Sequence, residues 1–345
     1  MQAVSVIMPC RNAVAFVQAA VASVLMQAGV QVELLLVDDG STDGSADAAK
    51  AAAASAAAQS PTGEAAGVLR VLPGPERGIS AAFNAGLAEA SHPLLARCDA
   101  DDLYPPGRLR RQADVLAADP QAVAVCGAYA TIDGRGRFVL AHHADRPAAD
   151  VTAELLAGGG PSHMCAYLFG TEAVRRLGGC REFFRTSEDA DLQFRLAAAG
   201  PVLFDPAVAY LYRLHDASIT HTEADERRKW FHQTALRFLE QRNATGADDL
   251  DRGTPPPVPV FDGNTTQVTR HQVYDMLVGE AWRRHAAGRR AAGLGCALRA
   301  ARRRWHSPAA WKQVAMVGLK PTPKATNMTT SADATEDGSG RESRA

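Results

Sequence analysis

The sequence predicts an α/β domain with a mostly parallel central sheet and helices on both of its faces, followed by a helical C-terminal appendage. Three observations predict this fold. Short apolar runs alternate with segments whose apolar residues recur at helical spacing. The run at 32–37 is apolar almost throughout, as a strand covered on both faces requires. Polar and acidic residues follow these runs, at the strand ends where ligands bind in such sheets.

In the first hundred residues, strands and helices are predicted in alternation. Pro9 ends the first strand and Gly29 ends the first helix, because both residue types interrupt regular structure. Asp43 or Ser45 can cap the second helix. The predicted strands are 4–9, 32–37, 68–72 and 93–97, and the predicted helices are 14–28, 46–59 and 78–90.

Beyond residue 103 the pattern is less regular, and the glycine run 158–160 with Pro161 interrupts it. Strands are predicted at 123–127, 137–140, 164–169 and 202–212, and helices at 108–116, 171–177, 189–199 and within 271–319. The proline-rich segment 254–259 is a linker or a rigid turn. The predicted regions are 1–222 for the α/β domain, with halves 1–102 and 103–222, then 223–320 for a basic helical region and 321–345 for a disordered tail.

The charge distribution separates the C-terminal region from the rest of the chain. The net charge of −1 gives no reason to expect a nucleic-acid partner. Residues 270–320 contain nine Arg and two Lys but only two acidic residues, so this segment has a net charge of about +9. The rest of the chain therefore has a net charge of about −10. This region has two interpretations. It either lies on an anionic membrane surface, with Trp282, Trp305 and Trp311 at the interface, or packs as a helical layer on the acidic domain.

Cysteine usage and hydropathy predict a cytoplasmic protein. The six cysteines are scattered without a CxxC pair, which argues against a disulfide framework and against a zinc site. Neither a signal peptide nor an apolar run of about 18 residues is found, so no transmembrane helix is predicted. If residues 271–320 bind lipid, the protein is expected at the inner face of the plasma membrane.

Three acidic residues, Asp99, Asp101 and Asp102, directly follow the strand predicted at 93–97. Like charges this close raise one another's pKa unless a cation neutralises them. Oxygen ligands at this density suit Mg²⁺ or Mn²⁺, which such sites usually share with substrate phosphates. The alternative interpretation of an isolated Asp-x-Asp is a solvated acidic turn.

Two more acidic groups occur at ends of predicted elements. Asp38 and Asp39 follow the strand at 32–37. Glu188, Asp189 and Asp191 belong to the first turn of the helix at 189–199, where the helix dipole favours carboxylates. The dipole lowers the pKa of Asp189 and its acidic neighbours raise it, so the sequence leaves the balance open.

Motifs in this order and spacing resemble those of the family-2 glycosyltransferases over roughly residues 2–222. They are Ser5-Val6-Ile7-Met8-Pro9 with Arg11 and Asn12, Val37-Asp38-Asp39-Gly40-Ser41-Thr42-Asp43, Arg77-Gly78-Ile79-Ser80, Ala96-Arg97-Cys98-Asp99-Ala100-Asp101-Asp102, Ser187-Glu188-Asp189-Ala190-Asp191-Leu192 and Tyr212-Arg213-Leu214-His215. Glu76 departs from the Asn that is common two residues before Gly78.

The resemblance implies the glycosyltransferase A fold, a nucleotide-diphospho-sugar donor and inversion at the anomeric carbon. It implies a hexosyltransferase-type enzyme that uses a UDP-sugar and a saccharide or lipid-linked hydroxyl acceptor, in the synthesis of cell-surface polysaccharide or glycolipid. By the same resemblance Asp39 reads the base in a pocket with Pro9, Arg11 and Asn12, and Arg77 reaches the nucleotide.

The same resemblance implies how the donor sugar leaves. A divalent ion on Asp101 would neutralise the departing diphosphate as a Lewis acid. Asp99 would hold the ribose or assist the metal, and His215 is a candidate third metal ligand. Asp102 is the weakest member of the cluster and caps the following segment.

On the acceptor side, the resemblance makes Asp189 the general base for the attacking hydroxyl. Glu188 and Asp191 belong to the same acidic motif. His163 precedes an apolar strand and is expected to be structural or to lie on the acceptor side.

Rival functions make different demands on the sequence. A sugar-1-phosphate nucleotidyltransferase would need a Gly-rich basic loop where Pro9-Cys10-Arg11-Asn12 stands. A receiver domain would need a Lys that is absent between residues 51 and 228. A glycosyltransferase-like binding protein without turnover would not need the acidic residues Asp99, Asp101 and Asp189.

Overall fold

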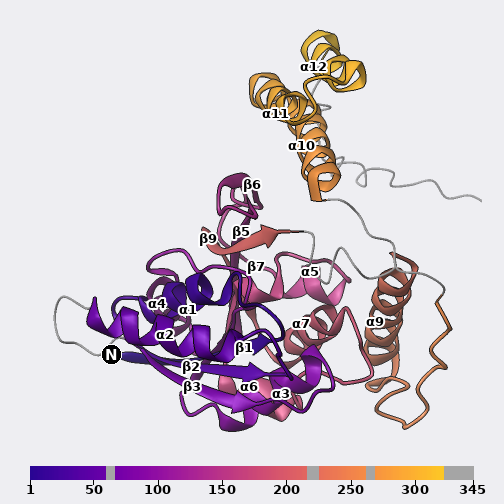
Figure 1. Cartoon of the computed structure of the whole chain (residues 1–345). Helices are drawn as coiled ribbons and strands as arrows, with labels where there is room; N and C mark the ends of the chain where they lie inside the picture. The colour runs from indigo at the N-terminus through magenta and orange to yellow at the C-terminus, as the bar shows by residue number, and fades with distance from the viewer. Residues whose placement is uncertain (60–66, 216–224, 262–268, 322–345) are drawn as a thin grey trace, which may run out of the picture. The chain divides into compact units, whose positions relative to one another are not determined.

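The computed structural model describes residues 1–59, 67–215, 225–261 and 269–321. The chain forms two compact units, Met1–Thr269 and Arg270–Ala345 (Figure 1). The first is an α/β domain, as the sequence predicts, and the second is helical where it is described. In these ranges no helix is both long enough and apolar enough to span a bilayer.

A mixed sheet forms the centre of the first unit, in the order β3-β2-β1-β4-β8-β5-β9-β7, with β6 paired to β5. From β3 to β4 the strands are parallel, whereas β8 runs antiparallel to β4 and β5. The strands are β1 (Gln2–Cys10), β2 (Val30–Asp38), β3 (Val68–Pro73), β4 (Leu94–Arg97), β5 (Ala124–Asp133), β6 (Phe138–His142), β7 (Ala149–Asp150), β8 (Tyr167–Gly170) and β9 (Val202–Leu214).

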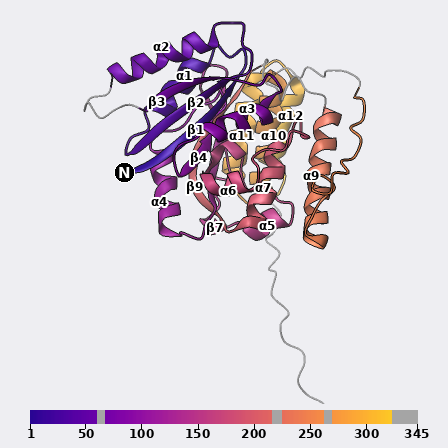
Figure 2. The same ribbon diagram turned by 90° about the horizontal axis from the view of Figure 1, so that it is seen from below.

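Helices cover both faces of this sheet (Figure 2). Alternate side chains of a strand point to opposite faces, so Ile7 joins one core and its neighbours Val6 and Met8 join the other. One face carries α1 (Val17–Leu25), α2 (Ser45–Ala58) and α4 (Arg108–Ala118). The other carries α3 (Ile79–Glu89), α5 (Thr152–Leu156), α6 (Thr171–Arg176), α7 (Glu188–Ala199) and α9 (Asp225–Thr245).

The first unit extends beyond residue 222, where the sequence predicted the domain to end. This boundary is corrected because α9 packs on α7 and buries Phe231, Phe238 and Leu239 in the domain core. Figures 1 and 2 both show α9 beside α7. The segment 254–259 contains no regular element. Most of the predicted tail, from residue 322, lies outside the described residues.

The predicted strand at 164–169 is only partly correct. Met164–Ala166 form a 3-10 turn, and β8 begins at Tyr167. The turn arises because His163 Nδ1 accepts a hydrogen bond from the Cys165 amide at 3.2 Å. The buried Arg108 guanidinium then donates to the carbonyl oxygens of Cys165 and Tyr167 at 2.7 and 2.6 Å.

The second unit contains α10 (Thr269–Ala286), α11 (Arg290–Arg303) and α12 (Pro308–Leu319). Its small core includes Ala281, Cys296, Ala297 and Val317. Trp282 is partly buried, and its ring nitrogen donates to Gln313 Oε1 at 3.0 Å. Trp305 and Trp311, in contrast, are 71% and 45% exposed.

Candidate active site

The C-terminal ends of β1, β2 and β4 bring three loops to one edge of the sheet. Cys10 lies opposite Asp38 on β2, and Ile7 lies opposite Arg97 on β4. The loops after these strands are linked, because Asn12 Oδ1 accepts the Thr42 amide at 2.9 Å. The predicted donor-site segments, 9–12, 38–43 and 97–102, are therefore adjacent in space.

Within this group, Pro9 is half-buried and Arg11 and Asn12 are exposed. Asn12 has a φ of 51°, a left-handed conformation that Asn tolerates better than most residues. Arg77 is 62% exposed and pairs with Glu182 at 3.2 Å. These side chains leave the loop surface open to a ligand.

Asp39 is buried and holds the loop 74–78 in place. Its two carboxylate oxygens accept the amides of Glu76 and Gly78 at 2.6 and 3.0 Å. Gly74 approaches so closely that a Cβ there would lie 2.7 Å from the Asp39 Cα. Glu76 has a φ of 56°, a left-handed conformation in which Asn is enriched.

The three carboxylates after β4 have different partners. Arg97 binds both oxygens of Asp99, at 2.7 and 3.2 Å. Asp101 Oδ2 lies 2.8 Å from His215 Nε2. Asp102 is fully buried and accepts from the Tyr210 hydroxyl and the Arg213 amide at 2.5 and 2.6 Å. Asp102 therefore stabilises the loop, whereas Asp99 and Asp101 keep partial exposure.

Asp101 and His215 fit a divalent cation in part. A carboxylate and an imidazole in direct contact form a donor pair suited to Mn²⁺, and Asp101 alone suits Mg²⁺. Asp99 is held by Arg97, and no group of three or more acidic, His or Cys ligands is preformed in the part of the chain that the structure describes. Sites of this kind take further ligands from substrate phosphates and water, and a cation here would need such ligands in addition to these two side chains.

Arg97 joins the carboxylates after β4 to the start of α7. It is nearly fully buried, and its Nη1 donates to Glu188 Oε1 at 3.1 Å while its other nitrogens hold Asp99. Burial raises the pKa of Glu188 to about 7, against the opposing effect of the Arg97 charge. One guanidinium therefore fixes the position of Asp189, the next residue, relative to Asp99.

Asp189 lies at the rim of a cavity of about 480 Å³. Ser187, two residues earlier, has a φ of 63°, which is unusual for a residue other than Gly, Asn or Asp and often marks functional sites. Gly158–Gly160, Ser162, Gln193 and His232 also line this cavity. His232 and Gln193 could not be predicted as site residues, because a polar residue in a helical sequence does not indicate which cavity its side chain borders.

His163 lies between the two groups of carboxylates. Its ring stacks on Tyr210 with centroids 5.5 Å apart. Burial lowers the pKa of His163, although the charges of Asp189 and Asp99 favour its protonated form. A neutral imidazole in a stack of rings matches the structural role.

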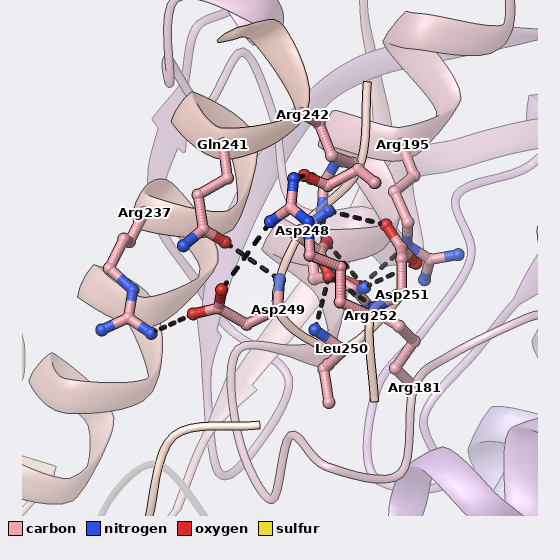
Figure 3. Close-up of polar contacts among 12 residues, drawn as sticks. Arg181, Arg195, Arg237, Gln241, Arg242, Asp248, Asp249, Leu250, Asp251 and Arg252 are labelled. Atoms are coloured by element: carbon pink, nitrogen blue, oxygen red, sulfur yellow. Dashed lines mark hydrogen bonds and ion pairs between the residues drawn. The ribbon is translucent and has the colours of Figure 1, made fainter. Parts of the chain in front are cut away.

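The assignment of Asp191 to the acceptor side is corrected, because Asp191, in the first turn of α7, is fully buried. Figure 3 shows its partners Arg181 and Arg195. Arg195 binds Asp191 at 2.8 Å, and Arg181 binds it through two nitrogens. Arg181 and Arg242 also bind Asp248, in the loop after α9. Asp191 therefore joins α7 to the end of α9 and does not reach a ligand.

Residues 5–176 match the model of a family described as glycosyl transferase family 2. An uncharacterized glycosyltransferase of Rickettsia conorii is 25% identical over 216 residues, which make up 61% of this chain and 34% of that protein. The chain thus spans about a third of the length of the first curated relatives that it matches.

Solved structures share the fold. Residues 1–349 of S. aureus TarS, in complex with UDP-GlcNAc, align with a TM-score of 0.53 at 15% identity, over 71% of this chain and 73% of that one. The mannosyltransferase PcManGT from Pyrobaculum calidifontis, in complex with GDP-Man and Mn²⁺, aligns with a TM-score of 0.51 at 19% identity, over 91% and 83%. The first unit has the glycosyltransferase A fold, and the chain belongs to glycosyl transferase family 2.

Proposed function

We propose that the first unit is an inverting hexosyltransferase that moves a sugar from a nucleotide-diphospho-sugar, a UDP-sugar, to a hydroxyl acceptor. The observation that carries the proposal is the Arg97 bridge, because it holds Asp99 and the Glu188–Asp189 pair around one buried guanidinium. A donor-side carboxylate and a base are thus held together, as direct displacement requires. The complexes of TarS with UDP-GlcNAc and of PcManGT with GDP-Man support the class of donor.

Asp189 is the general base in this proposal. The Oδ1 atom of Asp189 accepts a hydrogen bond from the backbone amide of Ala190, in the same helix, at 2.9 Å. Asp189 also borders the cavity. Asp189 takes the proton of the acceptor hydroxyl as that oxygen forms a bond to the anomeric carbon. The bond from this carbon to the diphosphate oxygen breaks on the opposite face, which inverts the configuration and releases a nucleoside diphosphate.

Asp101 and His215 would hold the divalent cation, Mg²⁺ or Mn²⁺, with Asp99 beside it. The cation would supply charge neutralisation to the leaving diphosphate. The loops with Pro9, Arg11, Asn12 and Asp39 would bind the base and ribose, and Arg77 would approach the phosphates. In this proposal Asp39 contributes to nucleotide binding by holding the loop 74–78 through its hydrogen bonds, in addition to any direct contact with the base.

We infer a role in cell-surface polysaccharide or glycolipid synthesis at the cytoplasmic face of the membrane. The second unit supports this inference, because it combines exposed Trp305 and Trp311 with a local charge of about +9 between residues 270 and 320. A lipid-linked acceptor would then be presented at the same surface.

Release of nucleoside diphosphate from a panel of UDP-sugars and GDP-sugars, with and without Mn²⁺, tests the proposed reaction. We expect one donor to be consumed in a Mn²⁺-dependent way, and Asp101→Asn to abolish the Mn²⁺ dependence of UDP affinity in calorimetry. Asp47→Asn is the control, because Asp47 is exposed on α2 and pairs with the exposed Lys50. If no donor is consumed and the affinity for UDP is the same with and without Mn²⁺, the proposal is wrong. Formation of a nucleotide-sugar from an added nucleoside triphosphate and sugar 1-phosphate, with release of pyrophosphate, would indicate a nucleotidyltransferase instead.

A further inference from the structure

The cavity beside Asp189 is larger than proton transfer alone requires. Its volume of about 480 Å³ falls within the range of about 300–1,000 Å³ that is typical of small-ligand sites. The glycine run 158–160, Ser162, the first turns of α7 and His232 of α9 form its wall. A monosaccharide or a short saccharide fits a space of this size.

The wall combines polar side chains with the apolar Ala190 and Phe194, and it carries little charge. Among the described residues that line the cavity, Asp189 is the only acidic one, and neither Lys nor Arg is present. Proteins usually bind phosphate with Arg, Lys or several convergent amides, so this wall does not suit a phosphorylated ring. The side chains of Ser162, Gln193 and His232 supply the donors and acceptors that sugar hydroxyls need.

Contacts outside the cavity hold the polar groups of its wall in position. The Tyr167 hydroxyl donates to Gln193 Oε1 at 2.8 Å, which orients the Gln193 amide. Ser162 Oγ donates to the carbonyl oxygen of Gly127, so the lone pairs of this hydroxyl remain suited to accepting a bond. The wall is therefore preorganised, which reduces the cost of ordering side chains on binding.

Helix α9 is fixed against the same cavity. Gly158 has a φ of 84°, which favours glycine, and a Cβ there would lie 2.8 Å from Leu236 Cδ2, so the loop closely approaches α9. Asn243 Nδ2 donates to the Leu156 carbonyl at 3.1 Å. Phe231 is fully buried, with its ring 6.1 Å from that of Phe184, and this anchors the neighbouring His232 at the cavity.

We propose that this cavity is the acceptor subsite and that it takes a neutral saccharide, with His232 and Gln193 as specificity-determining residues. The inference rests on the proposed glycosyl transfer and names the class of acceptor. One hydroxyl of the saccharide faces Asp189, and the others contact His232, Gln193 and the backbone of the glycine run. A phosphate in a larger acceptor would lie outside the cavity.

Gly160 allows the cavity to be blocked without disturbing the fold. Gly160 lines the cavity, a Cβ there meets no atom within 4 Å, and the φ of this residue is not positive, so Gly160→Phe adds a ring at the cavity wall at little backbone cost. Gly295→Phe is the matched control, because Gly295 is an exposed glycine of α11 whose Cβ also meets no atom within 4 Å. Thermal unfolding of each full-length variant verifies folding.

The probes are methyl glycosides of glucose, galactose, mannose and N-acetylglucosamine, and the corresponding 6-phosphates, measured by saturation-transfer NMR. We expect a neutral glycoside to bind the wild type and Gly295→Phe, and Gly160→Phe to abolish the signal. His232→Ala should weaken binding by about five- to tenfold, as expected for the loss of a hydrogen bond. The 6-phosphates should bind more weakly than the neutral glycosides.

Equal binding of glycosides to wild type and Gly160→Phe would overturn the inference, as would a preference for the 6-phosphates. A UDP titration with Mn²⁺ on the same wild-type sample separates the two proposals. If UDP binds and no neutral glycoside does, the assignment of the cavity is wrong and the proposed function stands. If UDP also fails to bind, both are contradicted.

Discussion

Arg97 connects the donor side and the acceptor side of the proposed site through ion pairs. Its guanidinium is nearly fully buried and contacts Asp99 on one side and Glu188 on the other. A planar fork of donors can bind two carboxylates at once, which a lysine ammonium cannot do with the same geometry. The position of Asp189 relative to the donor therefore depends on Arg97.

Arg97→Lys should lower turnover by about 100-fold, because misplacement of a reacting group by about 1 Å has an effect of this size. The KM for the donor should change less than threefold, since the charge beside Asp99 is retained. Steady-state kinetics with the donor identified by the release assay measures both quantities. Arg110→Lys is the control, because Arg110 is exposed and pairs within α4 with Asp114. Wild-type turnover in Arg97→Lys would contradict a positioning role.

At the residue level, the order of the acidic motifs predicted that the segments after β1, β2 and β4 lie together, because strand ends converge in a parallel sheet. The outcome differed for Asp189 and Asp191, which are two positions apart on one helix. Residues at this spacing face different directions, so one borders the cavity while the other is buried. The sequence could not show which of them faces a ligand, because Arg181, which binds Asp191, lies outside α7 and pairs in turn with Asp248 after α9.

At the level of elements, α9 completes the first unit although its sequence shows little amphipathic pattern. The ion cluster of Figure 3 explains its attachment: Asp248 is fully buried and accepts from Arg181 at 2.7 Å and from Arg242. Burial alone would raise the pKa of Asp248, but the two guanidinium groups hold it below its usual range. This stabilisation is present above the unfolded pKa of about 3.9 and is lost as the pH falls through the lower folded value.

Asp248→Asn should lower the free energy of unfolding by about 3 kcal/mol at neutral pH, because Arg181, Arg195 and Arg242 would then share the single buried counter-charge of Asp191. Asp251→Asn is the matched control, since Asp251 is 45% exposed and lies 3.6 Å from Arg181. This control should cost less than about 1 kcal/mol. Urea unfolding measures both changes. Equal, small losses would show that the cluster does not hold α9.

The strands of the first half of the sheet were predictable because continuous apolar runs mark buried parallel strands. The boundary at residue 222 was not, because the contacts of α9 with the core depend on Phe231 and Phe238 and not on local pattern. The turn at Met164–Ala166 was also missed, since Arg108 and His163 impose it from outside the segment.

At the level of the whole molecule, basic charge and exposed tryptophans gather in the second unit, and the first unit carries the acidic site. We expect the chain to sediment with anionic lipid vesicles at low salt and to be released by salt, because surface electrostatics is screened. The double variant Trp305→Ala/Trp311→Ala should reduce binding, whereas Phe138→Ala, an exposed aromatic of the first unit, should not. Failure to sediment with anionic vesicles at low salt would favour the packing interpretation, and binding insensitive to both salt and the tryptophans would contradict a role for the second unit.

The turnover of Asp189→Asn tests the central claim most directly. Asn keeps the size of the side chain but cannot accept the acceptor's proton, and general-base catalysis contributes about 10²–10⁴-fold. We predict that Asp189→Asn lowers kcat by about 1,000-fold with the donor that the wild type consumes, while UDP affinity stays within twofold. A variant that retains a tenth or more of wild-type turnover would contradict the assignment of Asp189 as the base.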